Sequence, residues 1–149
     1  MILDQDGRKR PQVLFLCTHN TARSQMAEAW LKKHAGDRFE VYSAGYEPTD
    51  INPFTRQVMA EVGLDLSGQY SKGVKEYLGK INFAYVISVC VRAEKICPIT
   101  FPSISRQRLF WPFEDPAAFE GTEEEKLAKF REIRDQIDRR ILQWLSELA

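Results

Sequence analysis

The chain has 149 residues, of which 21 are Lys or Arg and 21 are Asp or Glu, so its formal net charge is zero. This balance excludes a global electrostatic field that would attract nucleic acid or an anionic membrane, and any attraction for an anion must be local. The length suits one domain that buries roughly two thirds of its unfolded surface. We expect a charged, frayed tail over residues 1–11 and a single domain over residues 12–149.

The same composition bears on the compartment. No apolar run approaches the length of a membrane span, and residues 1–10 lack the apolar core of a secretory signal. Three cysteines without such a signal argue against a secreted domain held together by disulfides. The sequence therefore predicts a cytoplasmic protein.

Short apolar runs alternate with helical patterns along the chain. Strands are predicted over residues 13–16, 39–44, 83–89 and 108–111. Helices are predicted from Arg23, from Pro53 to a stop at Gly63, as a turn or two over 74–78, and after the capping box 122–125. Strands that alternate with helices imply an α/β fold, namely one four-stranded parallel sheet with helices on both faces.

The most informative stretch joins the first strand to the first helix and runs Cys17-Thr-His-Asn-Thr-Ala-Arg23-Ser24. A turn between a parallel strand and a helix points its backbone N–H groups and the positive end of the helix dipole at one place, where an oxyanion would bind. The same geometry, together with Arg23, would stabilise a thiolate on Cys17. A buried structural cysteine beside a surface arginine is the plainer alternative.

Two further residues are expected near this turn. Ligands of parallel sheets bind beyond the carboxyl ends of the strands. Cys17 follows the first predicted strand, Cys90 ends the third, and Asp115 lies four residues beyond Trp111. We therefore expect three chemically capable residues on one edge of the sheet.

Cys90 and Cys97 form a second candidate group. They could be small buried hydrophobic residues, and a zinc site is weakly supported because the chain has no Cys-x2-Cys pair and only two histidines. For a redox pair the spacing is restrictive, because seven residues of straight helix span about 10 Å. A disulfide needs Cα atoms within roughly 7 Å. A bond between Cys90 and Cys97 would thus require the segment to unwind, and Pro98 disfavours helix at Cys97.

Several motifs between Gln12 and the C-terminus carry a family resemblance. They are Cys17-Thr-His-Asn-Thr-Ala-Arg-Ser-Gln-Met-Ala-Glu28, Val41-Tyr-Ser-Ala-Gly45, Asn52-Pro53, Glu61-Val-Gly-Leu-Asp65, Cys90-x6-Cys97-Pro98, Trp111-x2-Glu-Asp115-Pro116 and Gly121-Thr-Glu-Glu-Glu125. With these motifs the chain resembles the thioredoxin-coupled arsenate reductases, which share the low-molecular-weight tyrosine phosphatase fold. The cysteine pair at this spacing is the part specific to the reductases.

The resemblance implies a role for each site residue. Cys17 would attack arsenate, Arg23 would hold it, and Asp115 would protonate a leaving oxygen. Cys90 would then form a disulfide with Cys17, and Cys97 would move that disulfide to Cys90–Cys97, where reduced thioredoxin acts. The loop residues would bind arsenate, or phosphate and sulfate as analogues, and these residues are Thr18, His19, Asn20, Thr21, Ala22, Arg23 and Ser24. We expect a monomer with no bound cofactor or metal.

The chain departs from the family pattern at two positions. Some members bind potassium with groups that match Asn20, Glu28, Ser43 and an aspartate, and the last position here is Lys72. Its ammonium could replace the charge of the cation, so the resemblance predicts no potassium requirement. Many relatives also have a cysteine before the loop arginine, where this chain has Ala22.

Three alternatives remain open at this point. A tyrosine phosphatase would need Cys17, Arg23 and Asp115 but not the other two cysteines, although Ala117-Ala118 stand where phosphatases carry aromatic residues. An arsenate reductase could instead use glutathione and glutaredoxin as electron donors. A non-catalytic anion-binding module is the third, and the intact catalytic set argues against it.

Overall fold

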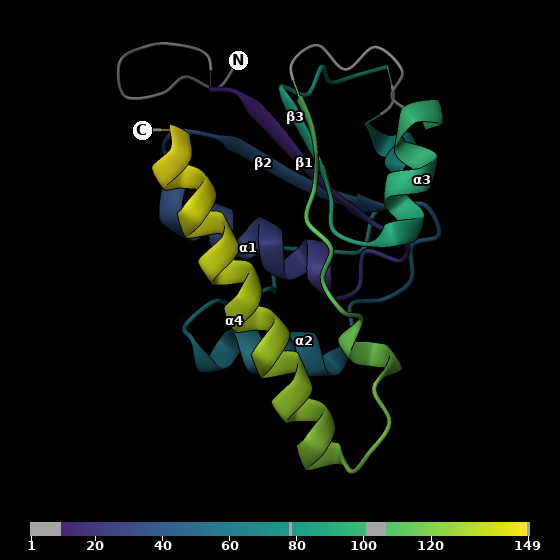
Figure 1. The fold of residues 1–149 in the computed structure, drawn as a ribbon, viewed down its shortest axis with the longest axis vertical. Helices are drawn as coiled ribbons and strands as arrows, with labels where there is room; N and C mark the ends of the chain where they lie inside the picture. Colours follow the sequence, from purple (N-terminus) through teal and green to yellow (C-terminus); the bar gives the residue numbers. More distant parts are fainter. Residues whose placement is uncertain (1–9, 78, 101–106, 149) are drawn as a thin grey trace.

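The computed structural model describes residues 10–77, 79–100 and 107–148, with only the backbone described for residues 97–100. In this part of the chain one parallel sheet has the strand order β2-β1-β3-β4 (Figure 1). The strands are β1 (Gln12–Cys17), β2 (Glu40–Gly45), β3 (Tyr85–Ser88) and β4 (Gln107–Phe110). The helices are α1 (Arg23–Ala35), α2 (Pro53–Glu61), α3 (Val91–Thr100) and α4 (Glu123–Leu148), with short 3-10 turns η1 (Val74–Glu76) and η2 (Pro116–Ala118). The predicted α/β class and parallel sheet are confirmed.

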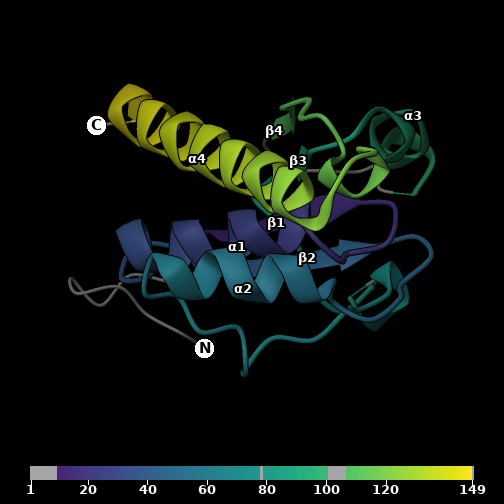
Figure 2. The same ribbon diagram turned by 90° about the horizontal axis from the view of Figure 1, so that it is seen from below.

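The helices form two groups around the sheet. α1 connects β1 to the outer strand β2, whereas α3 connects β3 to the opposite outer strand β4. Right-handed crossovers that run in opposite directions place their helices on opposite faces. Figure 2 shows α1 and α2 side by side with α4 packed across them, and α3 lies apart from this group, against β3 and β1. With both faces covered, Val13, Leu14 and Phe15 of β1 are fully buried.

The helix ends follow from local sequence. The Asn52 side chain accepts a hydrogen bond from the Phe54 amide, and Pro53 opens α2. Gly63 adopts a positive φ of 80° just after α2, a conformation that glycine tolerates without strain. Thr122 and Glu125 form the reciprocal capping box ahead of α4, because each side chain accepts from the other residue's backbone amide. These three predictions are confirmed.

One local prediction is wrong. Pro98 does not keep Cys97 out of a helix, since α3 continues to Thr100. The proline lies near the end of α3, where its missing N–H removes a single helical hydrogen bond, to the Glu94 carbonyl, and the helix tolerates this loss. Cys90 directly precedes α3 and Cys97 lies inside it, so helical backbone separates the two cysteines.

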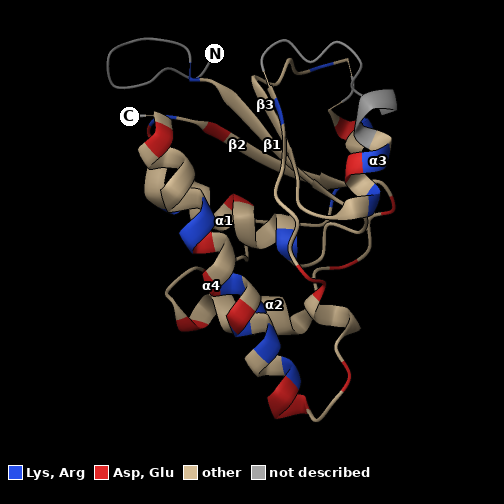
Figure 3. Ribbon diagram, viewed as in Figure 1, with Lys and Arg blue, Asp and Glu red and all other residues tan. Residues whose placement is uncertain are grey.

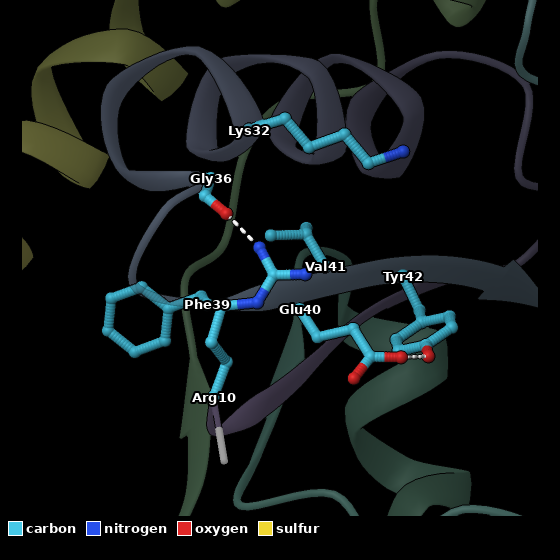
Figure 4. Close-up of a pocket in the computed structure, with 7 residues that line it drawn as sticks. All are labelled: Arg10, Lys32, Gly36, Phe39, Glu40, Val41 and Tyr42. Carbon is cyan, nitrogen blue, oxygen red and sulfur yellow. Dashed lines mark hydrogen bonds between the residues drawn. The ribbon is translucent and has the colours of Figure 1, made fainter. Parts of the chain in front are cut away.

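The amino ends of the strands lie away from the predicted site. Residues 1–9 of the predicted tail lie outside the described residues, whereas Arg10 donates a hydrogen bond to the Gly36 carbonyl and the Pro11 carbonyl accepts one from Glu40. Figure 4 shows the Arg10 guanidinium in a depression of about 290 Å³ beside Glu40, Tyr42 and the end of α1. These contacts join the start of the domain to α1 and β2.

Two further features bear on the surface. No helix in the described ranges has both the length and the apolar character that crossing a membrane requires. Figure 3 shows basic and acidic residues interspersed along α4 and α3 in this view. This mixture agrees with the zero net charge and leaves anion binding to local geometry.

Candidate active site

The candidate site is the loop between β1 and α1, at the carboxyl end of the sheet. Cys17 is the last residue of β1 and Arg23 is the first of α1. Within the loop Asn20 has φ +58°, a left-handed conformation that asparagine adopts more readily than most residues. The turn therefore brings the chain back over the Cys17 sulfur, and the Asn20 amide donates to that sulfur at 3.1 Å.

The loop carbonyls point away from its centre. Those of Thr18, His19 and Thr21 accept hydrogen bonds from the backbone amides of Glu47, Thr49 and Asn52, which flank the loop on the outside. Because the N–H and C=O of a trans peptide point in opposite directions, outward carbonyls turn amides toward the concave side. The arrangement can bind an oxyanion with backbone N–H groups at the start of α1.

Buried side chains support the loop from beneath. Ser24 is fully buried, and its Oγ lies 3.0 Å from Cys17 Sγ. The Asn20 side-chain amide donates to both Ser24 Oγ and Ser43 Oγ, while its oxygen accepts from the Gln25 side chain and the Lys72 backbone. Cys17 itself is 3% exposed. The sulfur is thus held by a hydroxyl and a backbone amide, and both can donate hydrogen bonds to a thiolate.

Gly45, at the end of β2, allows the loop to pack this closely. A Cβ atom at this position would lie 2.8 Å from backbone atoms of Thr18, His19 and Asn20, nearer than such atoms approach. The sequence analysis included Gly45 in a motif but gave it no role. Only its alignment with Cys17 in the sheet, which a linear pattern does not contain, reveals the constraint.

Arg23 and Asp115 come together as predicted. The Arg23 guanidinium donates to the Phe113 carbonyl at 2.9 Å, and its other terminal nitrogen lies 3.8 Å from an Asp115 carboxylate oxygen. The second oxygen of Asp115 accepts from the Ala117 amide and caps η2, while nearly half of the side chain stays exposed. The carboxyl group is therefore positioned and open to solvent.

Cys90 lies beside the loop. It follows β3 and is buried, and its sulfur is 3.5 Å from the Thr18 hydroxyl and accepts from the Ala93 amide at the start of α3. Cys17 and Cys90 are both free thiols. Cys97 belongs to α3 by its backbone, and its side chain is outside the described part of the structure. The sheet thus brings two of the three cysteines to the same loop.

Lys72 occupies a buried position behind the loop. Only 5% of its side chain is exposed, and its ammonium donates to the Tyr70 carbonyl and lies 3.6 Å from a Glu28 carboxylate oxygen. Glu28 also accepts hydrogen bonds from Ser43 and Lys32. Burial lowers the pKa of Lys72, and the Glu28 carboxylate partly offsets this effect. The Lys72 ammonium thus places a positive charge next to the Glu28 carboxylate, which also accepts from Ser43.

His19 has a structural contact. Its Nδ1 lies 2.8 Å from the Glu47 carbonyl, so the ring is bound to backbone at the outer side of the loop. Among the described residues, no cluster of three or more His, Cys, Asp or Glu could hold a metal ion.

Known proteins that resemble this chain identify first its family and then the branch of that family. The profile of the family described as low molecular weight phosphotyrosine protein phosphatase matches residues 12–149. A tyrosine phosphatase structure from Erwinia amylovora, 15% identical, shares the fold with a TM-score of 0.75 over 98% of each chain. The chain belongs to this phosphatase family.

Its nearer similarities lie with the family's arsenate reductases. An arsenate reductase from Halalkalibacterium halodurans is 48% identical and one from Bacillus subtilis 44%, each alignment covering 87% of this chain and 91% of the relative. A thioredoxin-dependent arsenate reductase structure from Corynebacterium glutamicum is 30% identical, with a TM-score of 0.69 over 93% of this chain and 61% of that one. The chain is therefore a member of the arsenate reductase branch of the family.

Proposed function

We propose that this protein reduces arsenate to arsenite through the thiols of Cys17, Cys90 and Cys97. The observation that carries the proposal is the proximity of two free, buried thiols to one anion-binding loop. A phosphatase needs only the Cys17 thiol, whereas arsenate reduction also needs a second thiol that forms a disulfide with Cys17. The arsenate reductases among the relatives support this choice of substrate.

In the first step the Cys17 thiolate attacks arsenic. The loop amides and Arg23 bind the arsenate oxygens, Ser24 donates a hydrogen bond to the attacking sulfur, and a sulfur–arsenic bond forms. One oxygen leaves as water after it receives a proton from Asp115, whose carboxyl group lies on the open side of Arg23.

In the second step the Cys90 thiolate attacks the Cys17 sulfur. A Cys17–Cys90 disulfide forms, the sulfur–arsenic bond breaks, and its electron pair stays on arsenic, which leaves as arsenite in the lower oxidation state. Cys97 then attacks Cys90, releases the Cys17 thiolate and leaves a Cys90–Cys97 disulfide. Helical backbone separates Cys90 from Cys97 and holds them too far apart for a disulfide, so the last step requires α3 to unwind.

For the reductant we propose thioredoxin, as in the relative from Corynebacterium glutamicum. Unwinding of α3 would expose the Cys90–Cys97 disulfide to the two thiols of thioredoxin. In a reducing cytoplasm, thioredoxin would reduce this disulfide and regenerate the enzyme for the next turnover. Arsenate-dependent oxidation of NADPH, compared between thioredoxin with thioredoxin reductase and glutathione with glutaredoxin, distinguishes the two electron donors. Weak hydrolysis of aryl phosphates is expected as a side activity, because the loop, Arg23 and Asp115 suit both reactions.

Two variants test the relay. With Cys90→Ser, no arsenite should leave unless thiol is added, because nothing displaces arsenic from Cys17. With Cys97→Ser, one equivalent of arsenite should leave and a Cys17–Cys90 disulfide should accumulate, as measured by mass spectrometry of single-turnover products. Both variants should retain aryl phosphate hydrolysis, and a Cys97→Ser enzyme that turns over normally with thioredoxin would refute the relay.

Hydrogen exchange tests the unwinding. On oxidation of the wild-type protein, amides across residues 88–100 should exchange faster, whereas the strand β1 should be unchanged. Unchanged exchange over residues 88–100 in a protein that carries the Cys90–Cys97 disulfide would contradict this step.

A further inference from the structure

We propose that the ion pair between Arg92 and Glu47 positions Cys90 for its attack on Cys17. This inference rests on the relay proposed above. Arg92 lies two residues after Cys90, in the first turn of α3, and Glu47 lies in the segment that follows β2. The pair is bidentate, with nitrogen–oxygen distances of 2.7 and 3.1 Å. In this proposal Arg92 is a positioning residue that acts through Cys90.

The pair closes a ring of contacts around the nucleophile loop. The Glu47 amide donates to the Thr18 carbonyl at 2.7 Å, and the Thr18 hydroxyl lies 3.5 Å from Cys90 Sγ. From Cys90 the chain leads directly to Arg92, which returns to Glu47. The loop, the Cys90 thiol and the ion pair are thus joined in one ring of contacts, and the Arg92–Glu47 pair opposes movement of the start of α3 away from the loop.

The chemistry of the pair suits a reversible contact. Both side chains are about half exposed, 55% for Arg92 and 52% for Glu47. The Arg92 guanidinium lowers the pKa of Glu47 by hydrogen bonding and by its charge, so the carboxylate remains ionised at neutral pH. Exposed ion pairs are weak and are screened by salt, so this contact can hold α3 in the reduced protein and still release it.

The step affected is the attack on the Cys17 adduct. The Cys90 sulfur forms a bond to the Cys17 sulfur, the sulfur–arsenic bond breaks, and arsenic keeps the electron pair. The attacking sulfur must approach along one line, and a helix start that samples other positions is less often in line. Attack on arsenate by Cys17, and hydrolysis of aryl phosphates, do not depend on Cys90.

The test measures formation of the Cys17–Cys90 disulfide after rapid mixing with arsenate, in a Cys97→Ser background that stops at this species. Arg92→Gln and Glu47→Gln should each slow the reaction roughly two- to fivefold, the range that an exposed ion pair supports. The double variant should be no slower than either single one, because both remove the same contact. High salt should slow the parent toward the rate of the variants, and aryl phosphatase activity should stay unchanged.

Arg131→Gln is the matched control. Arg131 forms a similar bidentate pair with Glu61 between α4 and α2, far from Cys90 in the sequence and in contact with no site residue described above. This variant should form the disulfide at the parent rate. Equal slowing by Arg131→Gln would assign the effect to general stability and overturn the positioning role.

The other outcomes separate the two proposals. If the parent forms no Cys17–Cys90 disulfide with arsenate, the relay itself fails. If the parent forms it and the two glutamine variants match its rate, only the positioning role fails. Slowing by Arg92→Gln alone, with Glu47→Gln at the parent rate, would show that Arg92 acts by its charge and would equally overturn the ion pair's role.

Discussion

The loop after β1 and the start of α3 both present a thiol at one edge of the sheet, but they are held in different ways. The loop is fixed by backbone amides and buried side chains from several segments, including Asn20, Ser24 and Ser43. α3 packs against β3 and β1 and buries Ala93, but its start is joined to the loop side by a 3.5 Å contact between Cys90 and Thr18 and by an exposed ion pair. A group that binds a reacting anion needs fixed geometry, whereas a thiol that must change partner needs an attachment that can open.

Substitution of the fixed thiol gives the largest expected effect. Cys17→Ser should abolish both arsenate reduction and aryl phosphate hydrolysis, because among the sulfurs that the structure describes this one lies where the loop amides, the start of α1 and the Ser24 hydroxyl converge. Steady-state assays of both reactions measure it. If the serine variant retained aryl phosphatase activity near wild type, the nucleophile would have to be another group.

The second prediction separates the two reactions that the fixed loop supports. Asp115→Asn should reduce aryl phosphate hydrolysis by a factor of about 10²–10⁴, the usual contribution of a proton donor to an ester leaving group. Arsenate reduction should fall less, because hydroxide can leave from a protonated form of the anion. The asparagine oxygen can still cap η2 as Asp115 Oδ1 does, so the fold is preserved. Equal losses in the two assays would contradict the distinction.

The third prediction concerns how tightly the loop is packed. Gly45→Ala should lower the free energy of unfolding by about 1–3 kcal/mol and weaken phosphate binding, because the new methyl group would meet loop backbone that cannot move aside. Gly68→Ala is the control, since nothing lies within 4 Å of a Cβ atom there, and its effect should stay within about 0.5 kcal/mol. Denaturant unfolding and phosphate titration give both quantities. Equal stabilities for the two variants would mean that the loop is more pliable than its contacts indicate.

The sequence predicts features that depend on neighbouring residues. Three such features each depend on a few adjacent residues, and the structure confirms them: the strand before Cys17, the capping box at Thr122 and the asparagine cap at Asn52. The meeting of Cys17, Cys90 and Asp115 at one edge follows from the parallel sheet alone, and the structure confirms the placement of their backbones. The chemical roles assigned to these residues remain predictions.

Other features could not be predicted, because they depend on residues far apart in the chain. The close approach at Gly45 depends on sheet register, and the ion pair of Arg92 and Glu47 joins residues 45 positions apart. The error at Pro98 has a different origin. Pro98 disfavours helix locally at Cys97, but α3 continues to Thr100 because the rest of the helix tolerates the loss of one hydrogen bond near its end.

The smallest expected effect concerns Lys72, which lies buried behind the loop. Its pKa is lowered by burial from the ordinary value of 10.5, so over a range of alkaline pH the unfolded chain holds a proton that the folded chain has released. Folding stability should therefore rise with pH between the folded pKa and 10.5, with a slope of at most about 1.4 kcal/mol per pH unit for one proton. Lys72→Met should abolish this contribution, whereas Lys75→Met, at an exposed position of η1, should retain it.

The same lysine allows a test of whether the loop requires a bound cation. If the ammonium beside Glu28 supplies the positive charge behind the loop, arsenate reduction by the wild type should be equal in potassium chloride and tetramethylammonium chloride of the same ionic strength. Lys72→Met should be slower in both salts, because Glu28 would keep only Lys32, whose side chain is half exposed, as its cationic partner among the described residues. Acceleration of the wild type by potassium would contradict this role. The geometry of the loop would then depend on a bound potassium ion that can dissociate, much as the start of α3 depends on an ion pair that can open. The two regions would differ less in how firmly they are held.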